Sequence, residues 1–353
     1  SVLIEDTMTS DKHIDQSGPP TMQDVAKLAG VSQPTVSRVL NNTKTTIPVS
    51  KKTRDKVLVA VKELGYRPNM TARSLRTQRT HMISLLVADI TNNFYHLIAQ
   101  AIQEVARAHD YDMLIANSDH VYENEKRFCE AVIRRPVDGV IMVPQYLTYG
   151  DLDELITLTN TPITVLGQHI NHPAIDVVGA DDEQATFEAI TWLIAERGHK
   201  SIGYIGVALD YPPSPRRWQG FQRALKTAGL TFDPDFYMQG DWSFESGRQA
   251  INRLLKIGKR PSAIFALNDL MAIGAILALQ DAGLSVPDDV AIMGFDNMRE
   301  ATIVRPRLTT IAQYPTEIGQ KVAEALFDRI EGREPDARRE LTVPLKLIVR
   351  ESA

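Results

Sequence analysis

The segment from residue 21 to residue 80 is rich in side chains that can neutralise phosphate groups. It holds twelve Lys or Arg against three Asp or Glu, a net charge of +9, whereas the whole chain of 353 residues carries −5. Residues 1–20 contribute −3, so residues 81–353 carry −11. Because Lys and Arg bind nucleic-acid phosphates through their charge, this asymmetry indicates a nucleic-acid-binding module attached to an acidic body.

A second group of side chains has the chemistry to hold a sugar. Asn268, Trp242 and Asp296 lie at the ends of predicted strands, and Arg217 begins a predicted helix after the strand-like run SIGYIGV. Converging Asp, Arg and Asn side chains can bind vicinal hydroxyls, and an indole offers a flat surface to the C–H face of a sugar ring. Each residue also has a structural explanation: Asp296 and Asn268 as helix caps, Arg217 as a surface charge, and Trp242 as core filler.

The capping residues and glycines of residues 21–65 predict three helices, which would position the basic side chains. Thr21 begins the first helix and Gly30 ends it; Ser32 begins the second; Ser50 begins the third, which ends at Gly65. A helix, a short turn containing Gly and a second helix form the spacing of a helix-turn-helix. The apolar side chains expected to face inward are Val25, Ala26, Leu28, Ala29, Val36, Val39, Leu40, Val57, Val61 and Leu64.

From residue 81 the pattern changes to short β-rich runs that alternate with amphipathic helices, in two successive series. This alternation predicts parallel sheets with helices on both faces, arranged as two lobes. Ligands of such folds bind at the carboxyl ends of the strands. Two facing lobes therefore predict a cleft that binds a ligand.

Several classes of protein are disfavoured by composition. The single cysteine, Cys129, excludes an intramolecular disulfide and is expected to be a buried or half-buried helix residue. No apolar run approaches the roughly 18 residues of a membrane span, and residues 1–20 are acidic and polar where a secretory signal would be basic and then apolar. We therefore expect a cytoplasmic protein with a disordered tail over residues 1–20, no membrane contact, no metal and no cofactor.

The stretches AKLAGVSQPTVSRVLNN and VSKKTRDKVLVAVKELGYRPN resemble the lactose repressor/galactose repressor (LacI/GalR) family of bacterial transcription regulators, as do the later motifs ALND, GFDN and LTTIAQ. The resemblance covers about residues 21–353. It implies an all-α helix-turn-helix head (21–67) and a hinge helix with linker (68–80), joined to a two-lobed α/β body (81–353) that resembles periplasmic sugar-binding proteins. The N-terminal lobe is expected at about 81–181 and 314–338, and the C-terminal lobe at about 182–313 and 339–353.

By this resemblance the second helix lies in the major groove of DNA. Base-reading residues are then Gln33, Pro34 and Arg38, and the chemistry favours adenine for Gln33 and guanine for Arg38, whereas Pro34 offers only an apolar contact. Phosphates are assigned to Thr21, Ser32, Thr35 and Asn41, although these side chains equally suit simple helix capping. In the hinge, Asn69 and Ala72 would face the minor groove and Leu75 would wedge between base steps; an ordinary basic linker is the alternative.

The resemblance also implies a small-molecule effector between the lobes. Its expected ligands are Phe94, Tyr95, Arg217, Trp242, Asn268 and Asp296, with Gln313 at the crossover between lobes and Gly167 where some relatives carry a polar side chain. A small carbohydrate is the favoured effector, with a purine or a phosphoprotein corepressor as alternatives. Partners are then double-stranded operator DNA and a second copy of the chain in a homodimer, because two heads must reach two half-sites.

Two other classes of function were compared with a DNA-binding repressor. An enzyme of the nicotinamide or nucleotide type would need GxGxxG after a strand or GxxxxGK[ST], and neither motif occurs, nor does a Ser/His/Asp or metal-ligand spacing. A solute-binding protein for transport would suit the cleft but would need export and would have no use for residues 21–80. We therefore expect a regulator that is not an enzyme.

Overall fold

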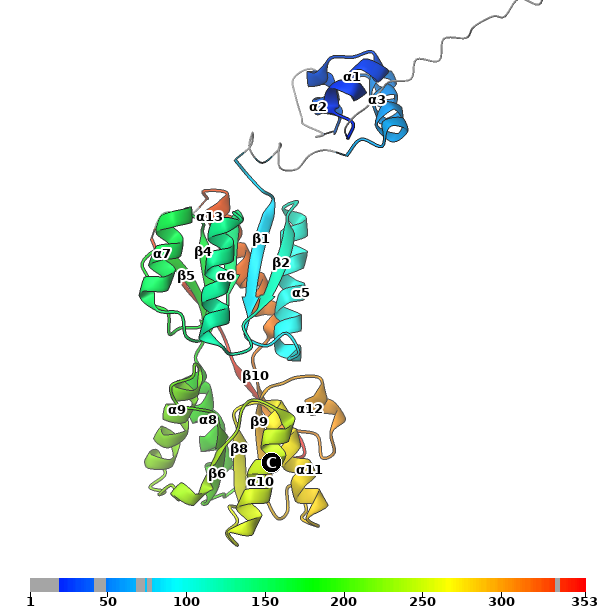
Figure 1. Cartoon of the computed structure of the whole chain (residues 1–353). Helices are drawn as coiled ribbons and strands as arrows, with labels where there is room; N and C mark the ends of the chain where they lie inside the picture. The colour runs from blue at the N-terminus through cyan, green and yellow to red at the C-terminus, as the bar shows by residue number, and fades with distance from the viewer. Residues whose placement is uncertain (1–18, 41–48, 68–73, 75–77, 334–336) are drawn as a thin grey trace, which may run out of the picture. The chain divides into compact units, whose positions relative to one another are not determined.

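The chain divides into two compact units, residues 1–80 and residues 81–353, each considered separately below (Figure 1). The computed structural model describes residues 19–40, 49–67, 74, 78–333 and 337–353. Most of the expected tail, the phosphate contact Asn41, and the hinge residues Asn69, Ala72 and Leu75 lie outside the described residues. Their predicted roles therefore stay predictions.

The first unit contains three short helices, α1 (Met22–Ala29), α2 (Gln33–Leu40) and α3 (Lys51–Leu64). Thr21 and Asp24 form a reciprocal capping box at the start of α1, and Ser50 caps α3 by accepting a hydrogen bond from the amide of Thr53. Gly30 and Gly65 end α1 and α3 in the left-handed conformation that glycine adopts without strain. The predicted helix boundaries are confirmed.

Val25, Val36 and Val57, one from each helix, are fully buried and form the centre of this small core. Leu28 was expected to face inward, but its side chain is 50% exposed. The expectation was wrong because Val25 and Ala29 already occupy the face of α1 that packs on the other helices, and Leu28 lies beside that face.

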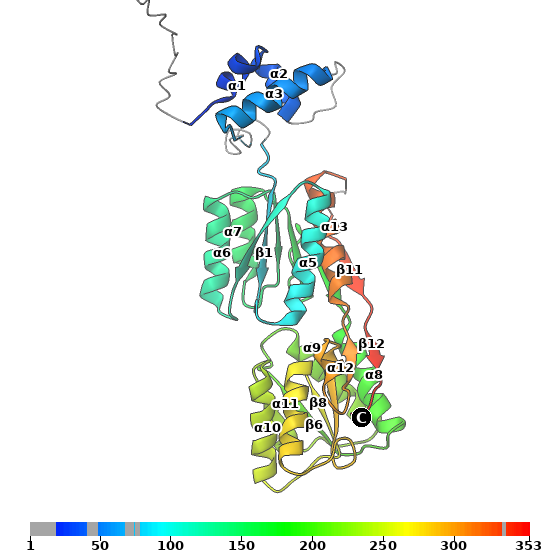
Figure 2. The same ribbon diagram turned by 90° about the vertical axis from the view of Figure 1, so that its right-hand side faces the viewer.

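The N-lobe of the second unit is built on a six-stranded sheet with the order β11-β5-β4-β3-β1-β2 and parallel pairing throughout. Its strands are β1 (Met82–Val87), β2 (Asp112–Asn117), β3 (Gly139–Met142), β4 (Ile163–Leu166), β5 (Ile175–Ala180) and β11 (Glu340–Val343). Its helices are α5 (Asn93–Ala108), α6 (Tyr122–Arg134), α7 (Tyr149–Thr159) and α13 (Pro315–Ile330). Helices α5 and α13 cover one face and α6 and α7 the other (Figure 2), so the lobe has an apolar cluster on each side of its sheet. Cys129 is buried on α6, as predicted, where burial raises the pKa of its thiol to about 12.

The C-lobe repeats this plan with the strand order β12-β10-β9-β8-β6-β7, in which only β12 runs antiparallel to its neighbour. Its strands are β6 (Ile202–Gly206), β7 (Tyr237–Gln239), β8 (Ala263–Ala266), β9 (Ala291–Asp296), β10 (Thr309–Ala312) and β12 (Lys346–Ile348). Its helices are α8 (Asp182–Ala195), α9 (Ser214–Thr227), α10 (Phe244–Lys256), α11 (Asp269–Asp281) and the short α12 (Glu300–Ile303), with a 3₁₀ turn η1 (Pro234–Phe236). A Cβ on Gly274 of α11 would lie 2.1 Å from the carbonyl oxygen of Phe244 in α10, so only glycine permits this helix contact.

Three crossings of the chain join the two lobes among the described residues: after β5, after β10 and after β11. The first two lie where the sequence predicted them, near residues 181 and 313. The third was expected after residue 338, but β11 pairs with β5 in the N-lobe sheet, so the chain crosses between Val343 and Lys346. In the sequence, β11 and β12 are two short, similar segments separated only by Pro344 and Leu345. Nothing in their residues indicated that the two strands belong to different sheets. No helix among the described residues combines the length and the apolar character needed to cross a membrane.

Candidate ligand-binding site and nucleic-acid interface

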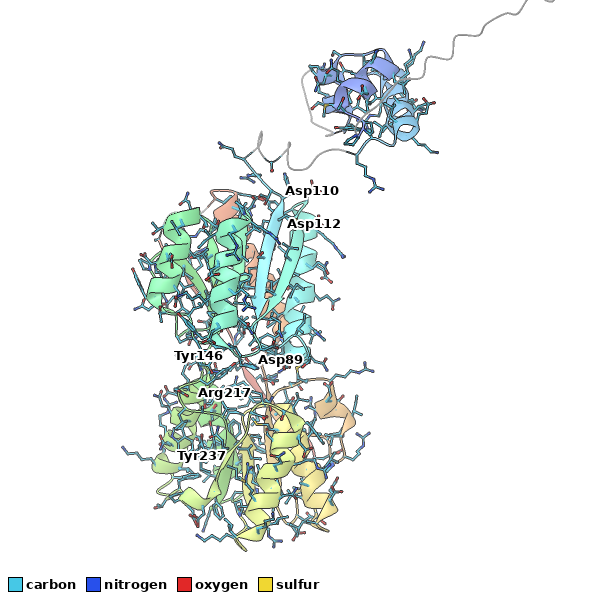
Figure 3. The ribbon with its side chains drawn as sticks, in the orientation of Figure 1. Asp89, Asp110, Asp112, Tyr146, Arg217 and Tyr237 are labelled. Atoms are coloured by element: carbon cyan, nitrogen blue, oxygen red, sulfur yellow. The ribbon has the colours of Figure 1, made fainter. Side chains whose placement is uncertain are left out.

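A cavity of about 320 Å³ lies between the carboxyl ends of the strands of the two lobes. All six predicted effector-binding residues line this cavity: Phe94, Tyr95, Arg217, Trp242, Asn268 and Asp296. Figure 3 shows Asp89 and Tyr146 of the N-lobe and Arg217 of the C-lobe at the junction between the lobes. We call this space the interlobe cavity; its volume lies at the lower end of the range for small-molecule sites. The binding role of the six residues stays a prediction.

Arg217 is the buried cation of the interlobe cavity. It lies on the first turn of α9, and its side chain is only 4% exposed. Its Nε donates to Asp182 Oδ1 at 2.8 Å and its Nη1 donates to the carbonyl oxygen of Leu267 at 2.5 Å. The guanidinium carbon lies 3.5 Å from the centre of the Phe295 ring. Arg217 is therefore anchored by the C-lobe itself and is not a free surface charge.

Asp296 ends β9 and lines the interlobe cavity, with a backbone φ of +119° that few residues other than glycine adopt. Gln313 Nε2 donates to its Oδ1 at 2.6 Å. Burial raises the pKa of Asp296 to about 7, against the opposing effects of the Arg217 charge and the Gln313 hydrogen bond. The carboxyl group can therefore change its protonation state near neutral pH.

A second buried acid, Asp269, lies behind Asp296. Its Oδ1 accepts from Thr310 Oγ1 at 2.6 Å and its Oδ2 accepts from the amide of Met298 at 2.7 Å. Burial, together with the nearby charge of Asp296, raises the pKa of Asp269 well above its ordinary value. Asp269 thus holds the loop that follows Asp296, and the charge of Asp296 disfavours the ionisation of Asp269.

Asn268 is both a helix cap and a support for Trp242. Its Oδ1 accepts from the amide of Met271 in the first turn of α11, so the capping role considered for it from the sequence is correct. Its Nδ2 donates to the Trp242 carbonyl oxygen at 2.8 Å, where Trp242 has a φ of +73°. The indole packs near Tyr211, with 5.8 Å between ring centroids. The asparagine therefore connects the end of β8 to the aromatic wall of the cavity.

The N-lobe side of the cavity includes two neighbouring aromatic residues. Phe94 and Tyr95 lie in the first turn of α5, with ring centroids 5.4 Å apart in an edge-to-face arrangement. Burial raises the pKa of the Tyr95 hydroxyl, and the charges of Asp296 and Asp89 act in the same direction. Tyr95 therefore stays protonated and can donate a hydrogen bond.

Several lining residues were missed by the sequence analysis, notably His120, Gln145, His169, Asp182 and Tyr211. His120 Nδ1 contacts the Tyr211 hydroxyl across the two lobes, and burial lowers the pKa of this imidazole. Like the predicted residues, Gln145 and Tyr211 follow the ends of strands, so a systematic search of every strand end would have found them. Among the described residues, no group of three or more side chains could hold a metal ion.

In the head, the predicted base-reading residues share helix α2. Gln33 and Pro34 are exposed and Arg38 is half-buried. Arg38 lies over the first turn of its own helix: its Nη2 donates to Thr35 Oγ1 and its Nε donates to the Pro34 carbonyl oxygen, both at 3.4 Å. These long contacts leave most of the guanidinium's hydrogen-bonding capacity for a partner such as a guanine edge.

The predicted phosphate contacts in the head are partly engaged within the protein. The Thr21 hydroxyl donates to Asp24 Oδ2 at 2.6 Å, and the hydroxyls of Ser32 and Thr35 lie 2.9 Å apart. The capping explanation considered for Thr21 is therefore correct, and a phosphate contact at this end of α1 would come from its backbone amides. Phosphate binding by Ser32 and Thr35 stays a prediction.

A basic helix-turn-helix unit followed by a two-lobed α/β body with a ligand-sized cavity defines a ligand-responsive DNA-binding protein. A model of bacterial regulatory proteins of the lacI family matches residues 21–69, and a periplasmic binding protein-like domain matches residues 193–353. The chain is 35% identical over 333 residues to catabolite control protein A of Priestia megaterium, covering 94% of this chain and 98% of that protein. It is 33% identical over 332 residues to the transcriptional repressor PurR of Pasteurella multocida, with the same coverage. The chain belongs to the lacI family of bacterial transcription regulators.

Solved structures agree with this membership over nearly the whole length. The lac repressor dimer bound to operator and the anti-inducer ONPF matches with a TM-score of 0.84 and 28% identity, over 95% of this chain and 99% of that one. The complex of the transcriptional regulator CelR with cellobiose matches with a TM-score of 0.70 and 30% identity, over 95% of this chain and 100% of that one. The predicted fold class, an α-helical DNA-binding head joined to a two-lobed α/β body, is confirmed.

The buried pair Arg217–Asp182 allows a test of what holds the C-lobe side of the cavity together. We expect Asp182→Ala to lower the free energy of unfolding by about 3–5 kcal/mol, because it leaves a buried guanidinium without its counter-charge. The double variant Arg217→Met/Asp182→Ala should lose less unfolding free energy than Asp182→Ala alone, because it leaves no unpaired buried charge. Urea unfolding of the full chain, followed by circular dichroism, measures both.

Asp281→Ala is the matched control. It removes the carboxylate of the more exposed ion pair Arg248–Asp281, in which Arg248 Nη2 and Asp281 Oδ2 lie 2.8 Å apart. This change should cost about 1 kcal/mol or less. Equal losses for Asp182→Ala and Asp281→Ala would show that Arg217 does not depend on its buried partner.

Proposed function

We propose that this protein is a cytoplasmic transcriptional repressor, active as a homodimer, whose affinity for operator DNA is controlled by a small carbohydrate in the interlobe cavity. The observation that carries the proposal is the convergence of Asp296, Arg217 and Asn268 with an aromatic wall inside one cavity lined by both lobes. Carboxylate and guanidinium groups suit sugar hydroxyls, and aromatic rings suit the C–H faces of a sugar.

The DNA-binding part of the proposal rests on the head. Its sequence window carries +9, and the exposed start of α2 presents Gln33 and Pro34 with Arg38 one turn further on. We assign base reading to these three residues, and phosphate contacts to Ser32, Thr35, Asn41 and the amides beside Thr21. The hinge assignment of Asn69, Ala72 and Leu75 follows from the family's motif alone.

A carbohydrate is favoured over the alternative effectors for a chemical reason. The C-lobe side of the cavity combines an acid with a buried cation, a pair that can accept from and donate to adjacent hydroxyl groups at once. The CelR neighbour is a cellobiose complex, which supports the same class. A purine is the second candidate, because the PurR relative is 33% identical and aromatic rings also stack on bases. Phe94, Tyr95 and Trp242 suit either ligand, so the acid and cation make the difference.

The effector can control DNA binding because residues of both lobes line its cavity. A ligand that contacts both lobes favours one lobe arrangement, and any arrangement that alters the two hinge segments of a dimer alters operator affinity. By linkage, operator and effector must change each other's affinity by the same factor, typically about 5-fold to 150-fold. Measuring one affinity with and without the other partner therefore gives the size and the sign of the control.

The test begins with DNA selected from a random library by the purified chain. Cellobiose, ribose and adenosine are then each added to a fluorescence-anisotropy titration of the selected operator, and thermal shift reports binding to the free protein. We expect a sugar to raise the melting temperature and to change operator affinity at least about 5-fold. A response to adenosine but to neither sugar would favour the purine alternative. Operator binding that none of the three compounds alters, with no thermal shift, would contradict the carbohydrate effector.

Arg38 provides the test of sequence reading. Arg38→Ala should lower the preference for the selected operator over random DNA by about 1–3 kcal/mol, because a bidentate contact to one guanine is lost. Lys52→Ala, on the exposed start of α3, is the control: it should weaken binding to all DNA sequences and reduce the salt dependence by about one charge. Anisotropy titrations at several salt concentrations separate the two effects. An unchanged operator preference in Arg38→Ala would remove Arg38 from the reading residues.

The raised pKa of Asp296 predicts that effector binding depends on pH. Sugar hydroxyls donate to the carboxylate, so the ligand favours the ionised form, and affinity should fall as pH drops through about 7. If binding requires the ionised form, affinity for the sugar found above should be about ten-fold weaker at pH 6 than at pH 8. Isothermal titration calorimetry measures this, and Asp296→Asn should bind weakly with little pH dependence. Affinity that is constant from pH 6 to pH 8 in the unmodified chain would argue against a hydrogen bond to an ionised Asp296.

A further inference from the structure

The loop after β3 brings one polar side chain, Gln145, into the wall of the interlobe cavity from the N-lobe. Gln145 is only 8% exposed, and its Nε2 donates to the Val143 carbonyl oxygen at 3.2 Å. Its Oε1 is buried and has no hydrogen-bond partner among the described residues. Buried polar atoms are nearly always paired. Among the described residues that line the cavity, Gln145 Oε1 is the one buried side-chain acceptor without a partner.

Glu125 of α6 holds this loop in place. Its Oε1 accepts from the amide of Gln145 at 2.7 Å, and its Oε2 accepts from the amides of Tyr146 and Leu147, both at 3.0 Å. The side chain is fully buried, and no Lys or Arg of the described residues forms an ion pair with it. A buried carboxylate without a counter-cation is costly, and burial indeed raises the pKa of Glu125. Glu125 therefore fixes the position of the loop after β3 through these three hydrogen bonds.

The two ends of the loop are also anchored. The Val143 amide donates to the Leu86 carbonyl oxygen at 2.9 Å, and Thr148 forms a capping box with Asp151 at the start of α7. Between these anchors, Tyr146 lies edge-on to Tyr211 of the C-lobe, with 5.8 Å between ring centroids. The loop is thus preorganised, and it contacts the other lobe through one residue while it presents Gln145 to the cavity through another.

We propose that Gln145 is a specificity-determining residue that accepts a hydrogen bond from the effector, and that Glu125 is the positioning residue that holds it there. This inference rests on the proposed effector site and adds to it a hydrogen-bond acceptor from the N-lobe. The effector must then carry a hydroxyl or amino donor that reaches Gln145. A ligand bound to Asp296 in the C-lobe and to Gln145 in the N-lobe bridges both lobes, so this hydrogen bond contributes to control of DNA binding as well as to affinity.

The test compares Gln145→Met with the unmodified chain, because methionine has a similar size and lacks the amide. Calorimetric titrations with cellobiose, ribose and adenosine are made on both proteins. For the probe that binds the unmodified chain, we expect the dissociation constant of Gln145→Met to rise at least about ten-fold, with a melting temperature of the free protein close to that of the unmodified chain. Gln222→Met, at an exposed position of α9, is the matched control and should leave affinity unchanged. Equal affinities of Gln145→Met and the unmodified chain would overturn the proposal.

Glu125 is tested by a double-mutant cycle, because its role passes through Gln145. Glu125→Gln should weaken the same probe several-fold in the unmodified chain and have no further effect in the Gln145→Met background. A purely structural role of Glu125 would instead weaken binding equally in both backgrounds, and that additivity would overturn the positioning role. If no probe binds the unmodified chain, the proposed effector class fails and this inference fails with it; normal binding to the unmodified chain with normal binding to Gln145→Met rejects the inference alone.

Discussion

The buried guanidinium of Arg217 is the contact on which the C-lobe side of the interlobe cavity depends. It joins Asp182 at the start of α8, the Leu267 carbonyl oxygen after β8 and the face of Phe295 on β9. Its positive charge also opposes the rise in the pKa of Asp296 that burial causes. A buried cation is tolerated only when it is paired, so these elements must meet at one place, and the cavity forms where they do.

The two lobes share one plan, and each contributes polar and aromatic side chains to the cavity. The buried cation Arg217 and the acid Asp296 come from the C-lobe, and Phe94, Tyr95 and the anchored loop with Gln145 come from the N-lobe. Contacts between the lobes among the described residues include polar and aromatic ones: Tyr146 with Tyr211, His120 with the Tyr211 hydroxyl, and Asn93 with Glu300. Contacts of this kind are weaker than a continuous apolar core, which is consistent with lobes whose arrangement responds to a ligand.

The family relationship and the geometry address different questions. Similarity over 94% of the chain establishes a lacI-family regulator, because both the DNA-binding head and the ligand-binding body are matched. It does not choose among effectors, since catabolite control protein A, PurR and the CelR–cellobiose complex all match this chain. The preference for a carbohydrate effector rests on the acid and the buried cation of this chain, with the cellobiose complex of the CelR neighbour as support.

The sequence by itself determined the alternation of strands and helices in the body and the helix caps at Thr21 and Ser50, because these follow from local periodicity and capping. The six residues that line the cavity were selected among strand-end residues by the family resemblance. Only the tertiary structure showed that β11 belongs to the N-lobe sheet, that Leu28 is exposed, and that Arg217 forms an ion pair with Asp182. It alone revealed that Glu125 holds Gln145 beside the cavity. The lobe that contains β11, the Arg217–Asp182 pair and the Glu125 hydrogen bonds depend on residues far apart in the chain. Their spacing carries no periodic signal, so packing of the folded protein had to bring them together.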